Sequence, residues 1–334
     1  MVQLVESSFY HRLSDHRKQS LCWCAYFFSC GKSGCIAGRW DDVPVRYAYA
    51  EGHADGCPAR TTIQVVAHRG ASEDAPEHTL AAYRKAIEDG ADALECDVRL
   101  TADGHLVCVH DRRVNRTSNG RGAVSALELR ELAALDFGSW KDADGTGGWA
   151  EGDPYESPDW EADPSERSTV LTLERLLELV TDVDRRIDLA IETKHPTRWA
   201  GQVEERLLEL LGRFGLRDPQ NAPEDRSRVR VMSFSARSLR RIQAGAPAVP
   251  AVYLMNYLLP RYRDGRLPAS ASIAGPAIRV LRAHPEYVAR VHRAGYHVHV
   301  WTVDEPGDVE LCVRLGVDAI ITNRPKQVLA QLSR

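Results

Sequence analysis

The segment ADALECDVRLTADGHLVCVHD, residues 91–111, carries the pattern that decides the fold. Side chains alternate between the two faces of an extended strand, so Leu94 and Cys96 share an apolar face. Glu95 and Asp97 then lie side by side on the opposite face. Two carboxylates held this close raise each other's pKa, and a hard divalent cation with oxygen ligands removes the repulsion. The segment therefore predicts a strand with one buried face and one face that holds a metal ion.

A second short strand is predicted directly after this one. Residues 102–104 form a turn signal, and the run 105–109 follows it and ends in His110 and Asp111. A histidine is therefore expected to return beside the carboxylate pair, where its charge can change near neutral pH.

The rest of the chain alternates between short apolar or β-branched runs and amphipathic helical patterns. We expect helices from residue 79 and over 173–179, 199–214, 236–244, 285–294, 306–315 and 325–332. The expected strands are 62–67, 91–98, 187–194, 229–233, 249–254, 272–274, 296–301 and 318–322. Such parallel-type alternation favours a TIM (β/α)₈ barrel over a doubly wound sheet. In addition, no GxGxxG nucleotide-binding motif opens the first strand–helix turn.

The composition limits the class of protein. The 334 residues include 43 basic and 47 acidic side chains, and the formal net charge of -4 gives no electrostatic footprint for nucleic acid. No apolar run reaches the length of about 20 residues that a transmembrane helix needs. Five of the eight cysteines precede residue 60, and the other three lie in apolar runs, as buried thiols do. We therefore expect a cytoplasmic protein with a reduced main domain.

Residues 1–60 differ from the rest because they show no helical or strand period of useful length. We interpret them as a leader that is disordered or belongs to a wrongly assigned start, with the barrel over 61–334. Two alternatives stay open. Residues 1–35 contain a short apolar run after basic residues and would act as an export signal. The cysteines at 22, 24, 30 and 35 would instead form a zinc cluster.

Residues 111–168 interrupt the alternation and are expected to form an insertion after the second strand. Ser125 to Glu128 fits a capping box that opens a short helix. The stretch 141–168 is rich in glycine and proline and holds nine acidic residues against two basic ones. Such a long stretch without a period is typical of a lid or a disordered excursion.

Reactive groups in a barrel of this kind gather where the strands end. The residues that this rule selects are His68, Glu95, Asp97, Glu192, Lys194, Ser233, Trp301 and Asn323. Carboxylates that point into a barrel are costly unless they are paired or bind a metal. We therefore predict that the three carboxylates bind a divalent metal ion, Mg²⁺ or Ca²⁺. The alternative is that they pair with Arg69, Arg99 and Lys194 and bind no metal.

Two histidines and two cations complete the predicted site. His68 and His110 lie on neighbouring connections, and imidazoles near a metal suit acid–base roles at neutral pH. Arg69 and Lys194 can hold anionic oxygens, while Trp301 offers an apolar wall for an alcohol moiety. Together these groups favour a phosphate ester as substrate over a sugar or a peptide.

With these residues in place, the sequence resembles the glycerophosphodiester phosphodiesterase family from about residue 63 to the C-terminus. The motifs that carry the resemblance are HRGASEDAPEHT (68–79), ALECDVRLTADGHLVCVHD (93–111), NRTSNGRG (115–122), IETK (191–194), MSFS (232–235), HVWTVD (299–304) and GVDAIITNRP (316–325). The ordered set is highly specific, although no single motif is.

The resemblance implies a TIM barrel with a family-specific insertion after His110. It also implies a divalent metal on Glu95, Asp97 and Glu192, an acid–base pair formed by His68 and His110, and phosphate contacts from Arg69 and Lys194. The implied reaction is hydrolysis of a glycerophosphodiester to sn-glycerol 3-phosphate and an alcohol. Two positions depart from the family pattern, because His78 replaces the usual Asn and Asn323 is often Asp in relatives.

Two other functions are considered. A lysophospholipase D would use the same site and add an apolar groove for the lipid chain. A non-catalytic barrel that binds phosphate esters would lack a metal ligand or a histidine, and neither is missing here. The expected partner is a small-molecule glycerophosphodiester, and the sequence predicts no particular oligomeric state.

Overall fold

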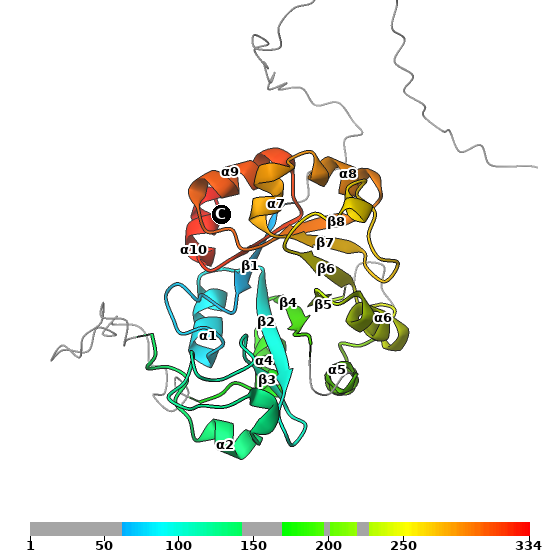
Figure 1. The fold of residues 1–334 in the computed structure, drawn as a ribbon. Helices are drawn as coiled ribbons and strands as arrows, with labels where there is room; N and C mark the ends of the chain where they lie inside the picture. Colours follow the sequence, from blue (N-terminus) through cyan, green and yellow to red (C-terminus); the bar gives the residue numbers. More distant parts are fainter. Residues whose placement is uncertain (1–61, 142–168, 197–200, 219–226) are drawn as a thin grey trace, which may run out of the picture. The chain divides into compact units, whose positions relative to one another are not determined.

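The computed structural model describes residues 62–141, 169–196, 201–218 and 227–334. Eight parallel strands close into a barrel with helices between them (Figure 1). The strands are β1 (Gln64–His68), β2 (Ala93–Leu100), β4 (Asp188–Thr193), β5 (Val229–Ser233), β6 (Ala251–Met255), β7 (Ile273–Pro276), β8 (His297–Val300) and β9 (Ala319–Thr322). This arrangement confirms the predicted TIM (β/α)₈ barrel.

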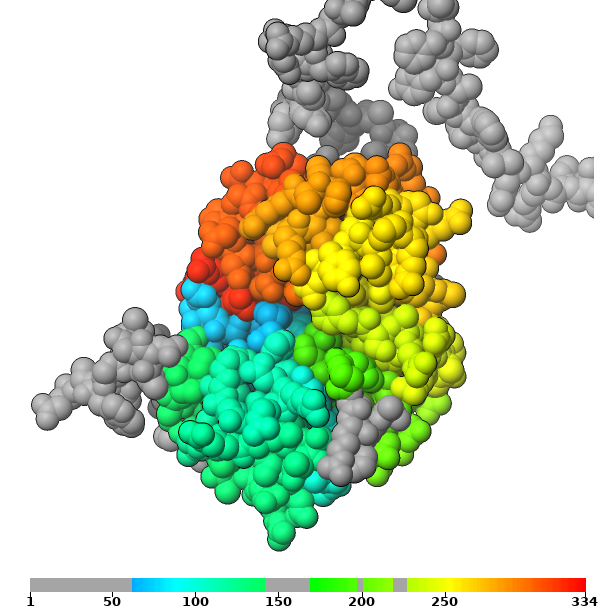
Figure 2. Space-filling view, in the orientation of Figure 1, coloured from blue at the N-terminus to red at the C-terminus, as the bar shows by residue number. Residues whose placement is uncertain are grey.

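The barrel closes where the first strand meets the last. β1 is hydrogen-bonded to β2 on one side and to β9 on the other, in parallel register. The space-filling view accordingly shows the first described residues (blue) against the last (red) (Figure 2). Closure leaves no free edge among the parallel strands. It also places the first strand of the barrel beside the last.

The helices follow their strands in sequence. They are α1 (Leu80–Glu88), α4 (Leu173–Asp182), α5 (Gln202–Arg213), α6 (Ala236–Gly245), α7 (Ile278–Ala283), α8 (Tyr287–Arg293), α9 (Pro306–Leu315) and α10 (Pro325–Gln331). Thr79 and Thr172 cap α1 and α4, because each side chain accepts a hydrogen bond from a backbone N–H of the first turn. α7 was not expected from the sequence, since its six residues are too few for a helical period to stand out.

The two faces of the strands carry different side chains, as the period of two requires. Leu94, Cys96 and Val98 of β2 are fully buried in the outer cluster, together with apolar residues of α4 and α5. The inner face is filled by a smaller apolar cluster of Val66, Ala93, Ala190, Met232, Val252, Leu254, Ile273, Ala319 and Ile321. Glu95 shares the inner face of β2 with Ala93, which confirms the predicted division of this strand.

A hairpin follows β2 and returns the chain to the site. β3 (Leu106–Cys108) pairs antiparallel with β2, and Val109 N donates to Asp97 O at 3.0 Å. The next residue is His110, which therefore reaches the end of β2 where the acidic side chains lie. This is the return that the sequence predicted.

The described part of the insertion packs on this hairpin. It contains the short helix η1 (Val124–Ala126) and α2 (Leu129–Ala133), with Val114, Val124 and Leu132 in a small apolar cluster. The predicted capping box at Ser125 is wrong. Ser125 lies inside η1, and the box is formed by Glu128 and Glu131, whose carboxylate accepts from Glu128 N at 2.8 Å.

The predicted leader and the acidic stretch 142–168 lie outside the described residues. Within the part of the chain that the structure describes, no helix has the length and apolar character needed to cross a bilayer. Cys96, Cys108 and Cys312 are free and buried, as their apolar surroundings predicted.

Candidate active site

The predicted side chains gather around one cavity at the ends of the strands. Its volume is about 290 Å³. The residues that line it include His68, Arg69, Glu95, His110, Glu192, Lys194 and Trp301. Sequence-distant residues meet here because parallel strands of a barrel all end at the same rim. Of the residues predicted at the strand ends, Asp97, Ser233 and Asn323 do not line the cavity, and Asp97 lies against the acids that do.

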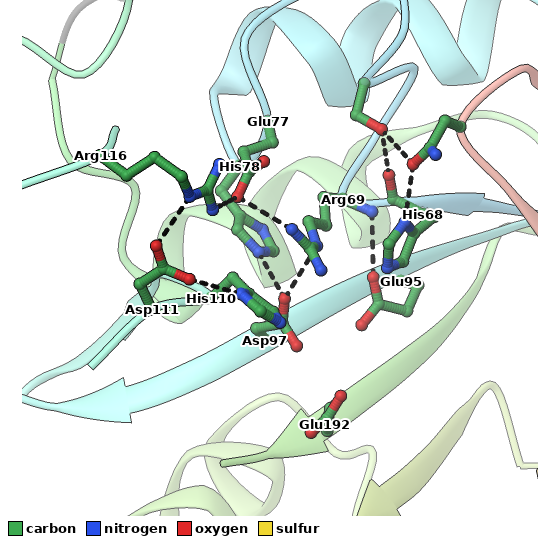
Figure 3. A network of polar contacts seen from close by, with 12 residues as sticks. His68, Arg69, Glu77, His78, Glu95, Asp97, His110, Asp111, Arg116 and Glu192 are labelled. Carbon is green, nitrogen blue, oxygen red and sulfur yellow. Dashed lines mark hydrogen bonds and ion pairs between the residues drawn. The ribbon is translucent and has the colours of Figure 1, made fainter. Parts of the chain in front are cut away.

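Three carboxylates form the centre of the site. One oxygen of each of Glu95, Asp97 and Glu192 lies within 4.8 Å of the others, and all three residues are buried. Strand register explains the meeting, because Asp97 on β2 is the direct partner of Glu192 on β4. Glu95 stands two residues earlier on the same face of β2 (Figure 3).

The electrostatics of the three acids differ. Burial, and then the neighbouring Asp97, raise the pKa of both Glu95 and Glu192 above the usual value. Burial also raises the pKa of Asp97, but Lys194, His78 and Arg69 outweigh it and hold this pKa well below its usual range. A divalent cation would allow all three to ionise. Buried, converging carboxylate oxygens are the donors that such a cation prefers, so the arrangement fits a divalent metal ion.

Two cations lie against the acids. Lys194 Nζ is 3.0 Å from Asp97 Oδ1 and 2.9 Å from Glu192 Oε1. Arg69 Nε is 3.2 Å from Asp97 Oδ2, and its backbone N–H donates to Glu95 Oε2 at 3.0 Å. Arg99 does not join them, because its guanidinium donates to the backbone oxygen of His110. The ion pairing that the sequence left open as an alternative thus occurs for Arg69 and Lys194 but not for Arg99.

His68 is held by residues from the far end of the chain. Its Nδ1 lies 2.7 Å from Asn323 Oδ1, which also accepts from Ser72 Oγ. Asn323 Nδ2 donates to Asp304, so Oδ1 is the acceptor and His68 Nδ1 carries the proton. Burial, followed by the charge of Arg69, lowers the pKa of His68 to about 3. The ring is therefore neutral, with a lone pair on Nε2.

His110 has a different partner. Its Nδ1 lies 2.7 Å from Asp111 Oδ1. Burial raises the pKa of Asp111, but hydrogen bonds from Arg116 and His110 outweigh it and lower this pKa to about 2. Asp111 is therefore ionised, and it accepts a hydrogen bond from Nδ1–H of His110. Burial lowers the pKa of His110, while the nearby Asp97 opposes the shift.

The opposite wall of the cavity is apolar. Trp301 follows β8, and its Nε1 donates to Gly275 O at 2.7 Å, which fixes the indole. Phe234 packs edge-on against it with ring centroids 5.5 Å apart. Met232, Leu254 and Ile321 complete this wall. The cavity therefore joins a charged side to an aromatic and aliphatic side.

Two strand-end residues behave differently from the expectation. Ser233 does not face the cavity, because it is fully buried and its Oγ donates to Thr193 O at 3.0 Å. The inward positions of β5 are its neighbours on either side, Met232 and Phe234, since one residue along a strand reverses the face. Asn323 lies behind His68 rather than in the cavity lining.

His78, where the family usually has Asn, supports the acidic centre. Its Nε2 lies 2.9 Å from Asp97 Oδ2 and its Nδ1 lies 2.8 Å from Tyr83 Oη. Tyr83 in turn donates to the backbone oxygen of Glu95 at 3.0 Å. His78 therefore forms a buried hydrogen bond with Asp97.

Further residues of the site were not found from the sequence. Glu77 and Arg116 connect the loops that carry Arg69 and His110 (Figure 3). Asn256 and Phe234 line the cavity. Loop residues follow no helical or strand period, so periodicity could not identify them. The only available signal was their position, since Glu77, Arg116 and Phe234 each lie inside a motif of the resemblance.

A parallel barrel whose mouth joins three buried carboxylates, two imidazoles and two cationic side chains is suited to the hydrolysis of a phosphodiester. The chain belongs to the glycerophosphoryl diester phosphodiesterase family, whose sequence model matches residues 68–327. It is therefore a phosphoric diester hydrolase that acts on glycerophosphodiesters. The resemblance noted in the sequence is confirmed.

Individual relatives agree with this assignment. A Mycobacterium tuberculosis protein named "Probable glycerophosphodiester phosphodiesterase 1" is 45% identical over 271 residues, which is 80% of this chain and 92% of that protein. A glycerophosphodiester phosphodiesterase of Caldanaerobacter subterraneus is 32% identical over 79% of this chain and 96% of its own length. The names of these relatives do not favour the lysophospholipase D or non-catalytic alternatives.

A solved structure supports the same reading. An Oleispira antarctica phosphodiesterase in complex with the product sn-glycerol-3-phosphate is similar with a TM-score of 0.66 and 25% sequence identity. The match covers 81% of this chain and 97% of that one.

Proposed function

We propose that this enzyme hydrolyses glycerophosphodiesters to sn-glycerol 3-phosphate and an alcohol, and that the reaction requires a divalent metal ion. The single observation that carries the proposal is the convergence of Glu95, Asp97 and Glu192 beside His68 and His110 in one cavity. The Oleispira antarctica relative, which holds sn-glycerol-3-phosphate, supports the choice of product.

In this proposal Glu95, Asp97 and Glu192 hold the metal, which is Mg²⁺ or Ca²⁺ because the donors are all carboxylate oxygens. When bound there, the ion supplies positive charge that stabilises negative phosphate oxygens. Arg69 and Lys194 bind the remaining phosphate oxygens from the same side. Both cations already point at the acidic centre, and charge-assisted bonds to a phosphate are strong.

We assign the base to His68 and the acid to His110. His68 is neutral and keeps a lone pair on Nε2, so it removes the proton from the attacking water. If a glycerol hydroxyl attacks instead, His68 removes its proton, and water then opens the cyclic phosphate that forms. His110 is backed by the Asp111 carboxylate, which stabilises a protonated ring that donates to the leaving alkoxide. The wall formed by Trp301 and Phe234 accommodates the apolar surface of the alcohol.

A substrate panel tests this function. Purified enzyme with Mg²⁺ or Ca²⁺ is assayed against glycerophosphocholine, glycerophosphoethanolamine and lysophosphatidylcholine, and the products are separated by chromatography. We expect sn-glycerol 3-phosphate from the first two substrates and little turnover of the third. Release of choline phosphate in place of free choline, or exclusive turnover of the lysolipid, would contradict the proposal.

We also propose the placement of the enzyme and its domains. The free buried thiols Cys96, Cys108 and Cys312 support a cytoplasmic location, with export through residues 1–35 as the alternative. Fractionation of cells that express the tagged full chain distinguishes the two. We propose a barrel over residues 61–334 with an insertion at 111–168, preceded by a leader.

A further inference from the structure

Arg116 joins two loops of the site although it does not line the cavity. Its Nε donates to Asp111 Oδ2 at 2.7 Å. Its Nη1 and Nη2 donate to the two carboxylate oxygens of Glu77 at 3.0 and 2.7 Å. The guanidinium therefore bridges a residue after β3 and a residue in the β1–α1 loop, with two bonds to one acid and one to the other (Figure 3).

Each acid held by Arg116 holds a functional side chain in turn. Asp111 Oδ1 lies 2.7 Å from His110 Nδ1. Glu77 Oε1 accepts from Arg69 Nη1 at 3.1 Å. Arg116 is thus connected to His110 through one carboxylate and to Arg69 through another, and both of these side chains line the cavity.

The charges make this arrangement stronger than a surface ion pair. Glu77 is only 11% exposed in its side chain, and burial raises its pKa, but the hydrogen bonds from Arg116 outweigh burial and lower it to about 2. The hydrogen bonds that Arg116 donates to Glu77 raise the pKa of Arg116. Arg116 also lies over the Trp140 ring at 5.8 Å. Bidentate, partly buried networks hold their geometry, whereas isolated exposed pairs contribute little.

We propose that Arg116 is a positioning residue that sets His110 and Arg69 relative to each other, through Asp111 and Glu77. The inference rests on the proposed function, in which His110 and Arg69 act on the substrate. A lysine cannot replace the bridge, because one ammonium group lacks the planar fork that meets two carboxylates at once.

The surroundings of His110 show why a bridge is useful. Asp97 on β2, Lys194 after β4 and Arg69 after β1 all influence its charge, and Arg99 holds its backbone oxygen. Among these groups, Asp111 is the one that bonds the ring, so the direction of Nε2 depends on where Asp111 is held. Misplacement of a catalytic group by about 1 Å is enough to cost roughly 100-fold in rate.

The test is a pair of double-mutant cycles in steady-state kinetics with a glycerophosphodiester and a divalent metal. The single variants are Arg116→Ala, Asp111→Asn and Glu77→Gln, and the cycles combine Arg116→Ala with each of the other two. We expect Arg116→Ala to lower kcat/KM by about 10- to 100-fold. We expect Asp111→Asn to act on kcat and Glu77→Gln mainly on KM.

The cycles should be strongly non-additive. In either single-variant background, Arg116→Ala should cost less than it does in the wild type, because one arm of its bridge is already broken. Asp111→Asn should also move the alkaline limb of kcat to lower pH, since loss of the carboxylate makes protonated His110 less stable. If Arg116 only stabilised the fold, the variants would not affect kcat, KM and the pH profile in these different ways.

Two further variants keep the test decisive. Arg116→Lys keeps the charge but not the fork, and it should recover only part of the loss. Arg121→Ala removes an exposed arginine from the same insertion and should behave as wild type. Full activity of Arg116→Ala or Arg116→Lys, or additive cycles, would overturn the positioning role. Inactivity of the wild type and Arg121→Ala on every substrate of the panel would instead refute the proposed function.

Discussion

At the scale of single residues, the two histidines are distinguished by what holds Nδ1. An amide oxygen of Asn323 holds His68, and the carboxylate of Asp111 holds His110. Both partners accept a hydrogen bond from Nδ1–H, so in each ring Nε2 is the nitrogen left for chemistry. Burial lowers the pKa of both rings, and the Asp111 carboxylate opposes this shift at His110. In the mechanism that we propose, the two rings take opposite tasks.

This difference leads to a prediction for the two imidazoles. His68→Ala and His110→Ala should each lower kcat by at least about 100-fold, because general acid–base groups contribute that much or more. His105→Ala serves as the control, since its side chain is 52% exposed in the turn before β3. Steady-state rates with glycerophosphocholine give the comparison. Near wild-type turnover of His110→Ala would reject its role.

The same scale shows what the sequence could and could not predict. Glu95, Asp97 and Glu192 were predictable, because the period of two and the strand-end rule are sufficient to place them. The prediction that Ser233 faces the cavity was wrong, because a shift of one position along β5 moves a side chain to the other face. Glu77 and Arg116 were missed because their partners are set by loop conformations, which no period encodes.

At the scale of elements, β4 and the turn after it place both Glu192 and Lys194. The turn is held by Glu204 of α5, which is 1% exposed in its side chain. His195 Nε2 lies 3.1 Å and Arg241 Nη1 lies 3.4 Å from Glu204 Oε1. A helix behind the barrel thus anchors the residue that follows Lys194.

Glu204 should also contribute to stability in a pH-dependent way. Burial raises its pKa, but the neighbouring His195 and other polar groups outweigh burial and lower the value from 4.5 to about 2. The folded state therefore favours the charged carboxylate. Its contribution, up to about 3 kcal/mol, is complete above pH 4.5 and is lost as the pH falls toward 2.

Urea unfolding of Glu204→Gln measures this contribution. The variant should be less stable than wild type at pH 7, and the difference should shrink below pH 4.5. Glu205→Gln, on the exposed face of the same helix, should match wild type at each pH. A difference that stays constant from pH 7 to pH 4 would show that ionisation of Glu204 is not the cause.

Elements also differ in how well the sequence predicts them. Long amphipathic helices such as α5 and buried β-branched strands such as β9 have patterns that stand out. α7 does not, and the start of α2 was misplaced because Ser125 is a preferred cap residue and Glu128, the observed cap, is not. Val124 of η1 and Leu132 of α2 pack in one apolar cluster, a tertiary contact that no local pattern encodes.

At the scale of the whole molecule, closure of the barrel makes the site. β9 lies beside β1, so Asn323 reaches His68 across 255 positions of sequence. β2 lies beside β4, so Asp97 reaches Glu192 across the insertion. The (β/α)₈ topology was predictable from alternation alone, and it implied these meetings before any distance was known.

In the mechanism that we propose, Glu95, Asp97 and Glu192 from two strands hold one metal ion that the reaction needs. The most direct test is the initial rate of glycerophosphocholine hydrolysis by enzyme treated with EDTA and then titrated with Mg²⁺ or Ca²⁺. We expect a loss of at least about 100-fold in chelator, recovery on adding the ion, and no recovery in Glu192→Gln. An unchanged rate in excess EDTA would contradict it.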